Sequence, residues 1–178
     1  QQETLFPYTT LFRSLPAPTQ DTLDGYLNSV LGKVRPWSED LREEQFYINR
    51  PWLEIRDDDS FHATVLHFFN EGGEYIRSTN GDLAIGNWRH QNNKLMIIHG
   101  DGGELYDLAF LDGQYFILQK SGGGSYFFMM LEPVGRAFKD RWLDAVEMLF
   151  KKSQSNISFY ILIGIAILLV LAILLVLR

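Results

Sequence analysis

Between Pro51 and Pro133 the chain alternates short apolar runs with turn residues. Eight runs rich in aromatic and aliphatic residues cover 52–56, 61–69, 75–79, 83–90, 94–99, 104–111, 114–120 and 125–132. The breaks between them include Asn80-Gly81 and Asp112-Gly113, which are strong hairpin signals because a tight hairpin turn needs residues that accept positive φ. Each break is too short for a crossover helix, so neighbouring strands should be antiparallel. The pattern predicts a mainly β fold, an antiparallel meander of about eight strands.

Both faces of this meander are substantially apolar. In the hairpin at Asp112-Gly113, opposite pairing would set Phe110 beside Tyr115 on one face. The same pairing would set Ala109 beside Phe116 on the other face. One face should therefore line an interior while the other is covered, and a strongly twisted meander closes on itself to remove its edges. We expect a small barrel or a strongly curved sheet, covered by an N-terminal helix.

Two amphipathic helices are predicted beside the meander. The first fits Asp21 to Val34, where apolar residues recur at a spacing of three and four, with Thr19 or Asp21 as its cap and Pro36 beyond its end. The second fits Val134 to Lys152, after the last strand. It could dock on the barrel or lie in a membrane interface, and its interleaved acidic and basic residues favour docking.

The apolar run from Ile157 to Leu177 carries no charge. As a helix that rises about 1.5 Å per residue, it would span about 30 Å, the thickness of a bilayer's hydrocarbon core. We therefore expect a transmembrane helix that anchors the chain to the lipid bilayer by its C-terminus; a buried core helix and a removed GPI-type tail are the alternatives. Basic residues precede the run and only Arg178 follows it, which predicts a single-pass, tail-anchored protein with a cytoplasmic domain. A signal peptide upstream would reverse that orientation.

The first residues do not read as natural protein sequence. Thr4 to Ser14 matches, residue for residue, the in-frame translation of a common sequencing-library adapter. We therefore expect the natural chain to begin near Leu15 and to lack its true N-terminus. The predicted division is an artefact over 1–14, a linker and helical segment over 15–50, a β-meander domain over 51–133, an amphipathic juxtamembrane helix with a polar hinge over 134–156, and a transmembrane helix over 157–177.

The composition of the chain argues against several classes of function. A net charge of −6 argues against a nucleic-acid partner, because phosphate binding needs a concentrated basic face. The sequence has no cysteine, which excludes disulfides, thiolate nucleophiles and Cys-based zinc sites. His67, His90 and His99 could converge in a folded sheet, but strand histidines are more often surface residues, so no metal site is expected. No catalytic or cofactor motif is present, so neither catalytic residues nor a cofactor are predicted.

A resemblance to a known type of barrel centres on Gly81 to Leu95. This segment contains Gly86-Asn87-Trp88, a Gly-x-Trp, in the middle of the meander. With the strands around it, the region 51–133 resembles the small lipocalin-like, calycin-type β-barrels. In the larger lipocalins Gly-x-Trp lies on the first strand. The resemblance implies a binding or scaffolding fold with no particular ligand.

Several aromatic residues are candidates for an apolar ligand pocket. They are Trp52, Trp88, Tyr106, Tyr115 and Phe116. Ordinary core packing is the alternative, because an eight-stranded barrel is just wide enough for its own side chains to fill. The leading hypothesis is a membrane-tethered, non-enzymatic interaction or scaffolding module for a protein partner. A lipocalin-like binder of a small apolar molecule near the membrane is the alternative, and an enzyme of unknown class is third.

Overall fold

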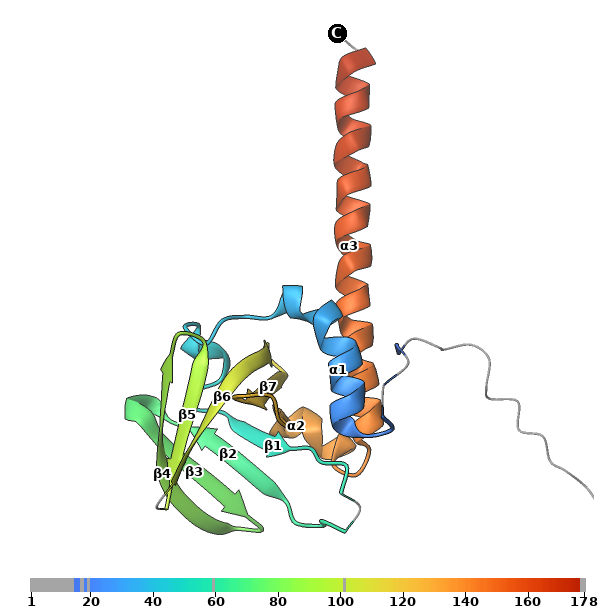
Figure 1. Cartoon of the computed structure of the whole chain (residues 1–178). Coiled ribbons are helices and arrows are strands. Elements are labelled where there is room, and N and C mark those ends of the chain that lie inside the picture. The colour runs from blue at the N-terminus through green and yellow to red at the C-terminus, as the bar shows by residue number, and fades with distance from the viewer. Residues whose placement is uncertain (1–14, 17, 19, 59, 101, 177–178) are drawn as a thin grey trace, which may run out of the picture.

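The chain closes an antiparallel β-barrel (Figure 1). The computed structural model describes residues 15–16, 18, 20–58, 60–100 and 102–176, without the side chains of 156–160, 170–172 and 174–176. The strands found over these residues are β1 (Pro51–Glu54), β2 (Val65–Phe69), β3 (Glu74–Thr79), β4 (Asp82–Gln91), β5 (Lys94–His99), β6 (Gly102–Leu111), β7 (Tyr115–Lys120) and β8 (Tyr126–Leu131). Each strand pairs with the next, and β1 pairs with β8. The predicted antiparallel meander and its closure are confirmed, and the barrel is compatible with a lipocalin-like fold.

Of the two hairpin turns predicted from the sequence, one forms as expected and the other does not. Asn80 and Gly81 have φ values of 51° and 100°, as a tight turn between β3 and β4 requires. The Asp112 turn is built differently, because its carboxylate accepts the backbone N–H groups of Gln114 and Tyr115 at 2.7 and 2.8 Å. A register shift between Leu108 and Phe110 then places Phe110 opposite Ile117. The predicted pairing of Phe110 with Tyr115 is therefore wrong.

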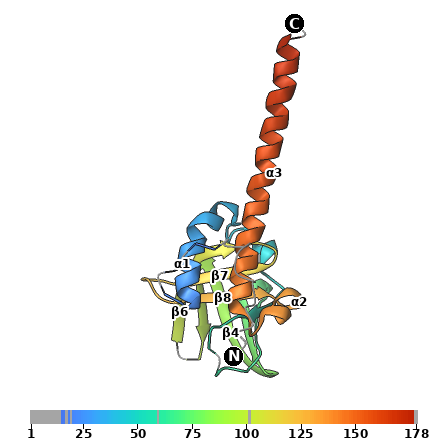
Figure 2. The ribbon, with the colours of Figure 1, turned by 90° about the vertical axis from the view of Figure 1, so that its right-hand side faces the viewer.

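Two helices cover one side of the barrel. Helix α1 (Leu23–Val34) begins after Thr22, whose hydroxyl accepts the N–H of Gly25 at 3.2 Å, and it lies beside α3 (Trp142–Val176) in both views (Figures 1 and 2). Apolar residues of both helices pack on the outer faces of β1, β6, β7 and β8. This outer core contains Leu27, Val30, Leu31, Leu53, Phe110, Tyr115, Ile117, Phe128, Val146 and Leu149. The prediction that the N-terminal helix covers the outer face is confirmed.

The second predicted helix is interrupted. The segment after β8 forms α2 (Glu132–Gly135) and a turn of 3-10 helix, η4 (Arg136–Phe138), and α3 begins only at Trp142. Ser153 lies within α3, so the predicted polar hinge there is helical. Lys152 attaches α3 to the barrel by donating to Asp112 Oδ2 at 2.7 Å and to Gln114 Oε1 at 2.9 Å.

A second core fills one end of the barrel. The chain between α1 and β1 carries two short 3-10 turns, η1 (Arg35–Trp37) and η2 (Glu44–Phe46), and crosses this end; a third, η3 (Glu71–Gly73), precedes β3. The backbone N–H of Glu39 donates to Leu111 O and that of Asn49 donates to Phe69 O, both at 2.8 Å, which ties the crossing segment to the barrel rim. The barrel core at this end contains Leu41, Tyr47, Trp52, Phe69, Trp88, Leu95, Leu108, Leu111, Phe116, Leu118 and Met129.

The C-terminal part of α3 projects away from the barrel (Figure 1). Over the described part of the chain, no helix combines the length and apolar character needed to cross a membrane. The predictions of a transmembrane helix over 157–177, of tail anchoring and of a single-pass localisation are therefore wrong. Leu177 and the side chain of Ile157, which were to bound the anchor, lie outside the described residues.

Candidate binding site at the open end of the barrel

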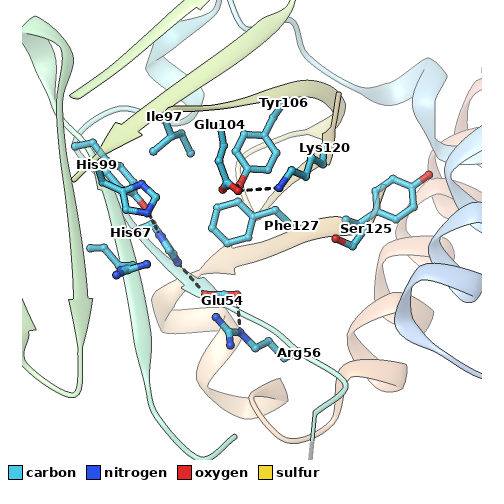
Figure 3. Close-up of a pocket in the computed structure, with 13 residues that line it drawn as sticks. Glu54, Arg56, His67, Ile97, His99, Glu104, Tyr106, Lys120, Ser125 and Phe127 are labelled. Carbon is cyan, nitrogen blue, oxygen red and sulfur yellow. Dashed lines mark hydrogen bonds and ion pairs between the residues drawn. The ribbon is translucent and has the colours of Figure 1, made fainter. Parts of the chain in front are cut away.

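The end of the barrel opposite the filled core holds a cavity of about 310 Å³. Its wall comes from seven strands, all except β4, and from the residues next to them, and Figure 3 shows ten of the lining side chains labelled around a common hollow. The lining consists of Glu54, Arg56, His67, Tyr75, Arg77, Ile97, His99, Glu104, Tyr106, Lys120, Ser125, Tyr126 and Phe127. Charged, aromatic and aliphatic groups thus face the same space.

Strand β4 approaches β5 closely at Gly86. Ala84 pairs with Arg77 of β3, and Gly86 pairs with Tyr75. They share the inward face of β4 with Trp88, two residues further along, because side chains alternate along a strand. A Cβ atom at Gly86 would collide with the carbonyl oxygen of Ile98, so the close approach of β4 and β5 requires glycine. The first residue of the Gly-x-Trp therefore permits the close packing of β4 on β5, and its tryptophan lies in the filled core.

A chain of hydrogen bonds links four residues along one wall. Arg56 Nε donates to Glu54 Oε1 at 2.6 Å, and His67 Nε2 lies 3.1 Å from Glu54 Oε2. The Tyr75 hydroxyl lies 2.6 Å from His67 Nδ1. A neutral histidine can satisfy both contacts, with Nε2–H donating to the carboxylate and Nδ1 accepting from the tyrosine. Both ring nitrogens of His67 are therefore occupied.

The protonation states of this chain follow from burial. His67 is 2% exposed, and burial lowers its pKa despite the hydrogen bond to Glu54, so the imidazole is neutral. Burial acts to raise the pKa of Glu54, but hydrogen bonds from His67 and Arg56 outweigh it and hold the pKa below its ordinary value. Burial also raises the pKa of the Tyr75 hydroxyl, which stays protonated. The chain therefore holds one ion pair, Glu54 with Arg56, next to a neutral imidazole.

A second ion pair lies across the cavity. Glu104 accepts from Lys120 Nζ at 2.8 Å and from the Tyr106 hydroxyl at 2.5 Å (Figure 3). The hydrogen bond from Lys120, followed by that from Tyr106, lowers the pKa of Glu104. Each oxygen of this carboxylate thus has its own donor.

Two buried nitrogen atoms in the wall have no such partner. Arg77 Nε and His99 Nδ1 are buried, and neither has a hydrogen-bond partner among the residues that the structure describes. Arg77 also forms no ion pair within the described part of the chain. Unpaired buried donors are rare in folded proteins and call for an explanation.

The structure distributes the predicted pocket aromatics over three places. Trp52, Trp88 and Phe116 lie together in the filled core, and their exposed fractions are 0%, 7% and 0%. Tyr115 lies in the outer core under the helices. Tyr106 alone of these five lines the cavity. That these five residues contact a ligand stays a prediction, because none of these observations tests ligand binding.

Predicted polar candidates are only partly brought together. His67 and His99 line the same cavity, whereas His90 lies near Tyr47 at the filled end, with 3.2 Å between its Nδ1 and the hydroxyl. The described residues contain no group of three or more His, Asp or Glu side chains that could hold a metal ion. The charged residues of the cavity carry no local motif, so sequence reasoning missed Glu54, Arg77 and Glu104. Because side chains alternate along each strand, these residues can be assigned to the inner face of the barrel once the strand register is known.

A neighbouring cavity shares a wall with the first. It has a volume of about 280 Å³ and lies between the β1–β2 connection and the start of α3. Glu54 and Arg56 line both cavities, and the Arg56 guanidinium lies 3.9 Å from the centre of the Phe61 ring. The ion pair of Glu54 and Arg56 therefore separates the two spaces.

Three hydrogen-bonded residues of the main cavity are not activated for nucleophilic or acid–base chemistry. Burial raises the pKa of Tyr106 as well as that of Tyr75, so neither hydroxyl is activated as a nucleophile. His67 is committed to Glu54 and Tyr75, so it has no free nitrogen to act as a base on a ligand. Fold and site together define a closed antiparallel β-barrel with one polar, open end. Searches against protein-family models, curated proteins and solved structures find no match.

Proposed function

We propose that this chain is a non-enzymatic binding protein that takes one small organic molecule into the open end of its barrel. The observation that carries the proposal is the cavity itself, which remains inside a barrel whose other end is filled by aromatic side chains. A volume of about 310 Å³ lies at the lower end of the range typical of small-molecule sites. Tyr75, Ile97 and Phe127 offer apolar surface, while polar groups can fix the orientation of the ligand.

The test is native mass spectrometry of the full chain isolated without denaturation from the cells that produce it. We expect an adduct of one small organic molecule per chain, which disappears after unfolding and refolding. Ser125→Trp should remove the adduct, because Ser125 is an exposed lining residue at which an indole can block the cavity without disturbing the core. Leu83→Trp is the matched control, because Leu83 is 67% exposed and lies on the outward face of β4. An adduct that persists in Ser125→Trp would contradict binding at this end.

A second candidate, a protein-interaction module, is favoured by the outer face of β4. Leu83 and Ile85 lie on this face and are 67% and 69% exposed. Apolar side chains gathered on an outer face are common at interaction sites. A defined partner protein should then lose affinity for Leu83→Ser and bind Ser125→Trp as well as the wild type. The opposite ranking would favour the ligand-binding function.

A further inference from the structure

The unpartnered nitrogens of the cavity indicate which chemical group its ligand carries. Arg77 Nε and His99 Nδ1 both belong to lining residues and are buried without a hydrogen-bond partner among the described residues. A buried donor that has lost its water loses free energy unless an acceptor replaces that water. Arg77 Nε can only donate, and His99 Nδ1 donates when it carries the ring proton, so an acceptor group can satisfy both atoms.

The charges of the lining make that acceptor an anion. The cavity has two carboxylates, Glu54 and Glu104, against the three cationic side chains of Arg56, Arg77 and Lys120. Arg56 is paired with Glu54, and Lys120 is paired with Glu104. The guanidinium of Arg77 is the cation left over within this lining. A buried charge is stable when it is both paired and hydrogen-bonded.

The two donors come from different strands of the barrel but line one cavity. Arg77 lies on β3 and His99 on β5, and both residues belong to the same lining. One anionic group bound in this cavity can therefore face both donors. Guanidinium groups favour carboxylates, because the two parallel N–H donors of the guanidinium match the two acceptor oxygens of the carboxylate.

We propose that the ligand is a small apolar organic acid whose carboxylate accepts hydrogen bonds from Arg77 and His99. Its apolar body would contact Tyr75, Ile97 and Phe127 of the same cavity. The inference rests on the proposed binding function and adds the charge of the ligand and the residues that recognise it.

The experiment compares two probes of nearly equal shape, 2-naphthoate and 2-naphthamide, by isothermal titration calorimetry with the full chain. We expect 2-naphthoate to bind at least about tenfold more tightly, because only the acid neutralises Arg77. Arg77→Gln should reduce this preference to about one while changing the affinity for the amide by less than about twofold. His99→Gln should remove part of the preference.

Arg89→Gln is the matched control for the loss of a positive charge. Arg89 also lies on the barrel wall, but on the outer face of β4, where it donates to the sulfur of Met96 at 3.3 Å. We expect this variant to keep the full preference for the acid. Equal loss in Arg77→Gln and Arg89→Gln would show a long-range effect of net charge and would overturn the assignment.

The remaining outcomes separate this inference from the proposed function. If both probes bind the wild type equally, the barrel binds ligands but does not select an acid, and the inference fails alone. If neither probe binds at millimolar concentration and no adduct is seen by native mass spectrometry, both fail. The comparison of two probes on the wild type needs no variant, so it holds even if Arg77→Gln does not fold.

Discussion

The two ends of the barrel are built from the same strands and differ in almost every physical property. At one end Trp52, Phe69 and Phe116 fill the interior and are 0% exposed, and the segment with Leu41 and Tyr47 covers them. At the other end charged side chains surround a cavity. The first arrangement gains free energy from burial of apolar surface, whereas the second pairs most of its polar groups and leaves Arg77 Nε and His99 Nδ1 at a cost that a bound partner can offset. One end therefore stabilises the fold and the other end is available for function.

The largest expected effect is the removal of the central tryptophan. Trp52→Ala deletes a fully buried ring and the hydrogen bond from its Nε1 to Tyr47 O at 2.9 Å. We expect the free energy of unfolding to fall by about 4 kcal/mol in urea denaturation. Phe127→Ala, at the half-buried cavity wall, should lose less than half as much. Equal losses at both ends would remove the distinction between them.

The next effect is a pH dependence that arises at the cavity. The pKa of buried His67 lies below its ordinary value of 6.5, so the unfolded chain binds a proton first as the pH falls. Stability should be unaffected by this group above pH 7 and should decrease below about pH 6.5, by at most about 1.4 kcal/mol per pH unit. His67→Gln should flatten this part of the curve in denaturation measured from pH 7.5 to 5.5. The exposed His62→Gln should leave the slope unchanged.

A matched pair of hydroxyl deletions should distinguish the two ends more finely. Tyr47→Phe leaves the carbonyl oxygen of Leu41, 3.0 Å from the hydroxyl, without that donor in the filled core, and should destabilise by about 1 kcal/mol. Tyr106→Phe leaves Glu104 with Lys120 as a partner, so we expect a loss below about 0.5 kcal/mol. Thermal melts of both variants give the comparison, and the reverse order would contradict it.

The smallest effect on stability should come from a residue proposed to bind the ligand. Arg77→Met removes a buried, unpartnered nitrogen, so the free energy of unfolding should stay constant or rise by up to about 1 kcal/mol in the ligand-free protein. Chemical denaturation after removal of any adduct measures it. A loss of more than about 1 kcal/mol would mean that Arg77 stabilises the fold, in conflict with its proposed role.

The fold was predictable where one physical signal dominates. The alternation of apolar runs with turn residues gave the antiparallel meander, and Asn80-Gly81 adopts the positive φ values that its type of turn needs. The register at Asp112 was not predictable, because side-chain hydrogen bonds and the bulge beyond Leu108 decide it. The predicted membrane anchor is wrong, because no helix in the described part of the chain is long and apolar enough to cross a membrane.

The cavity could not be predicted from local sequence. Its charged residues come from different strands, and a register slip of one residue would turn each of them outward. Only barrel closure brings Glu54 of β1 and Lys120 of β7 into the same lining. The Gly-x-Trp gave no hint of the cavity, because Gly86 permits the close packing of β4 on β5 and Trp88 lies in the filled core.

Closure of the barrel by β1 and β8 also sets the order in which this protein can form. Leu53 of β1 pairs with Met130 of β8, so β1 can pair with β8 only after all the other strands have been synthesised. Helix α1 and the hairpins depend on local contacts and can form early, whereas the closing ladder must wait for the end of β8. Until then the unpaired side of β1 is open to other chains. Slow synthesis or truncation ahead of Met130 should therefore leave an aggregation-prone intermediate.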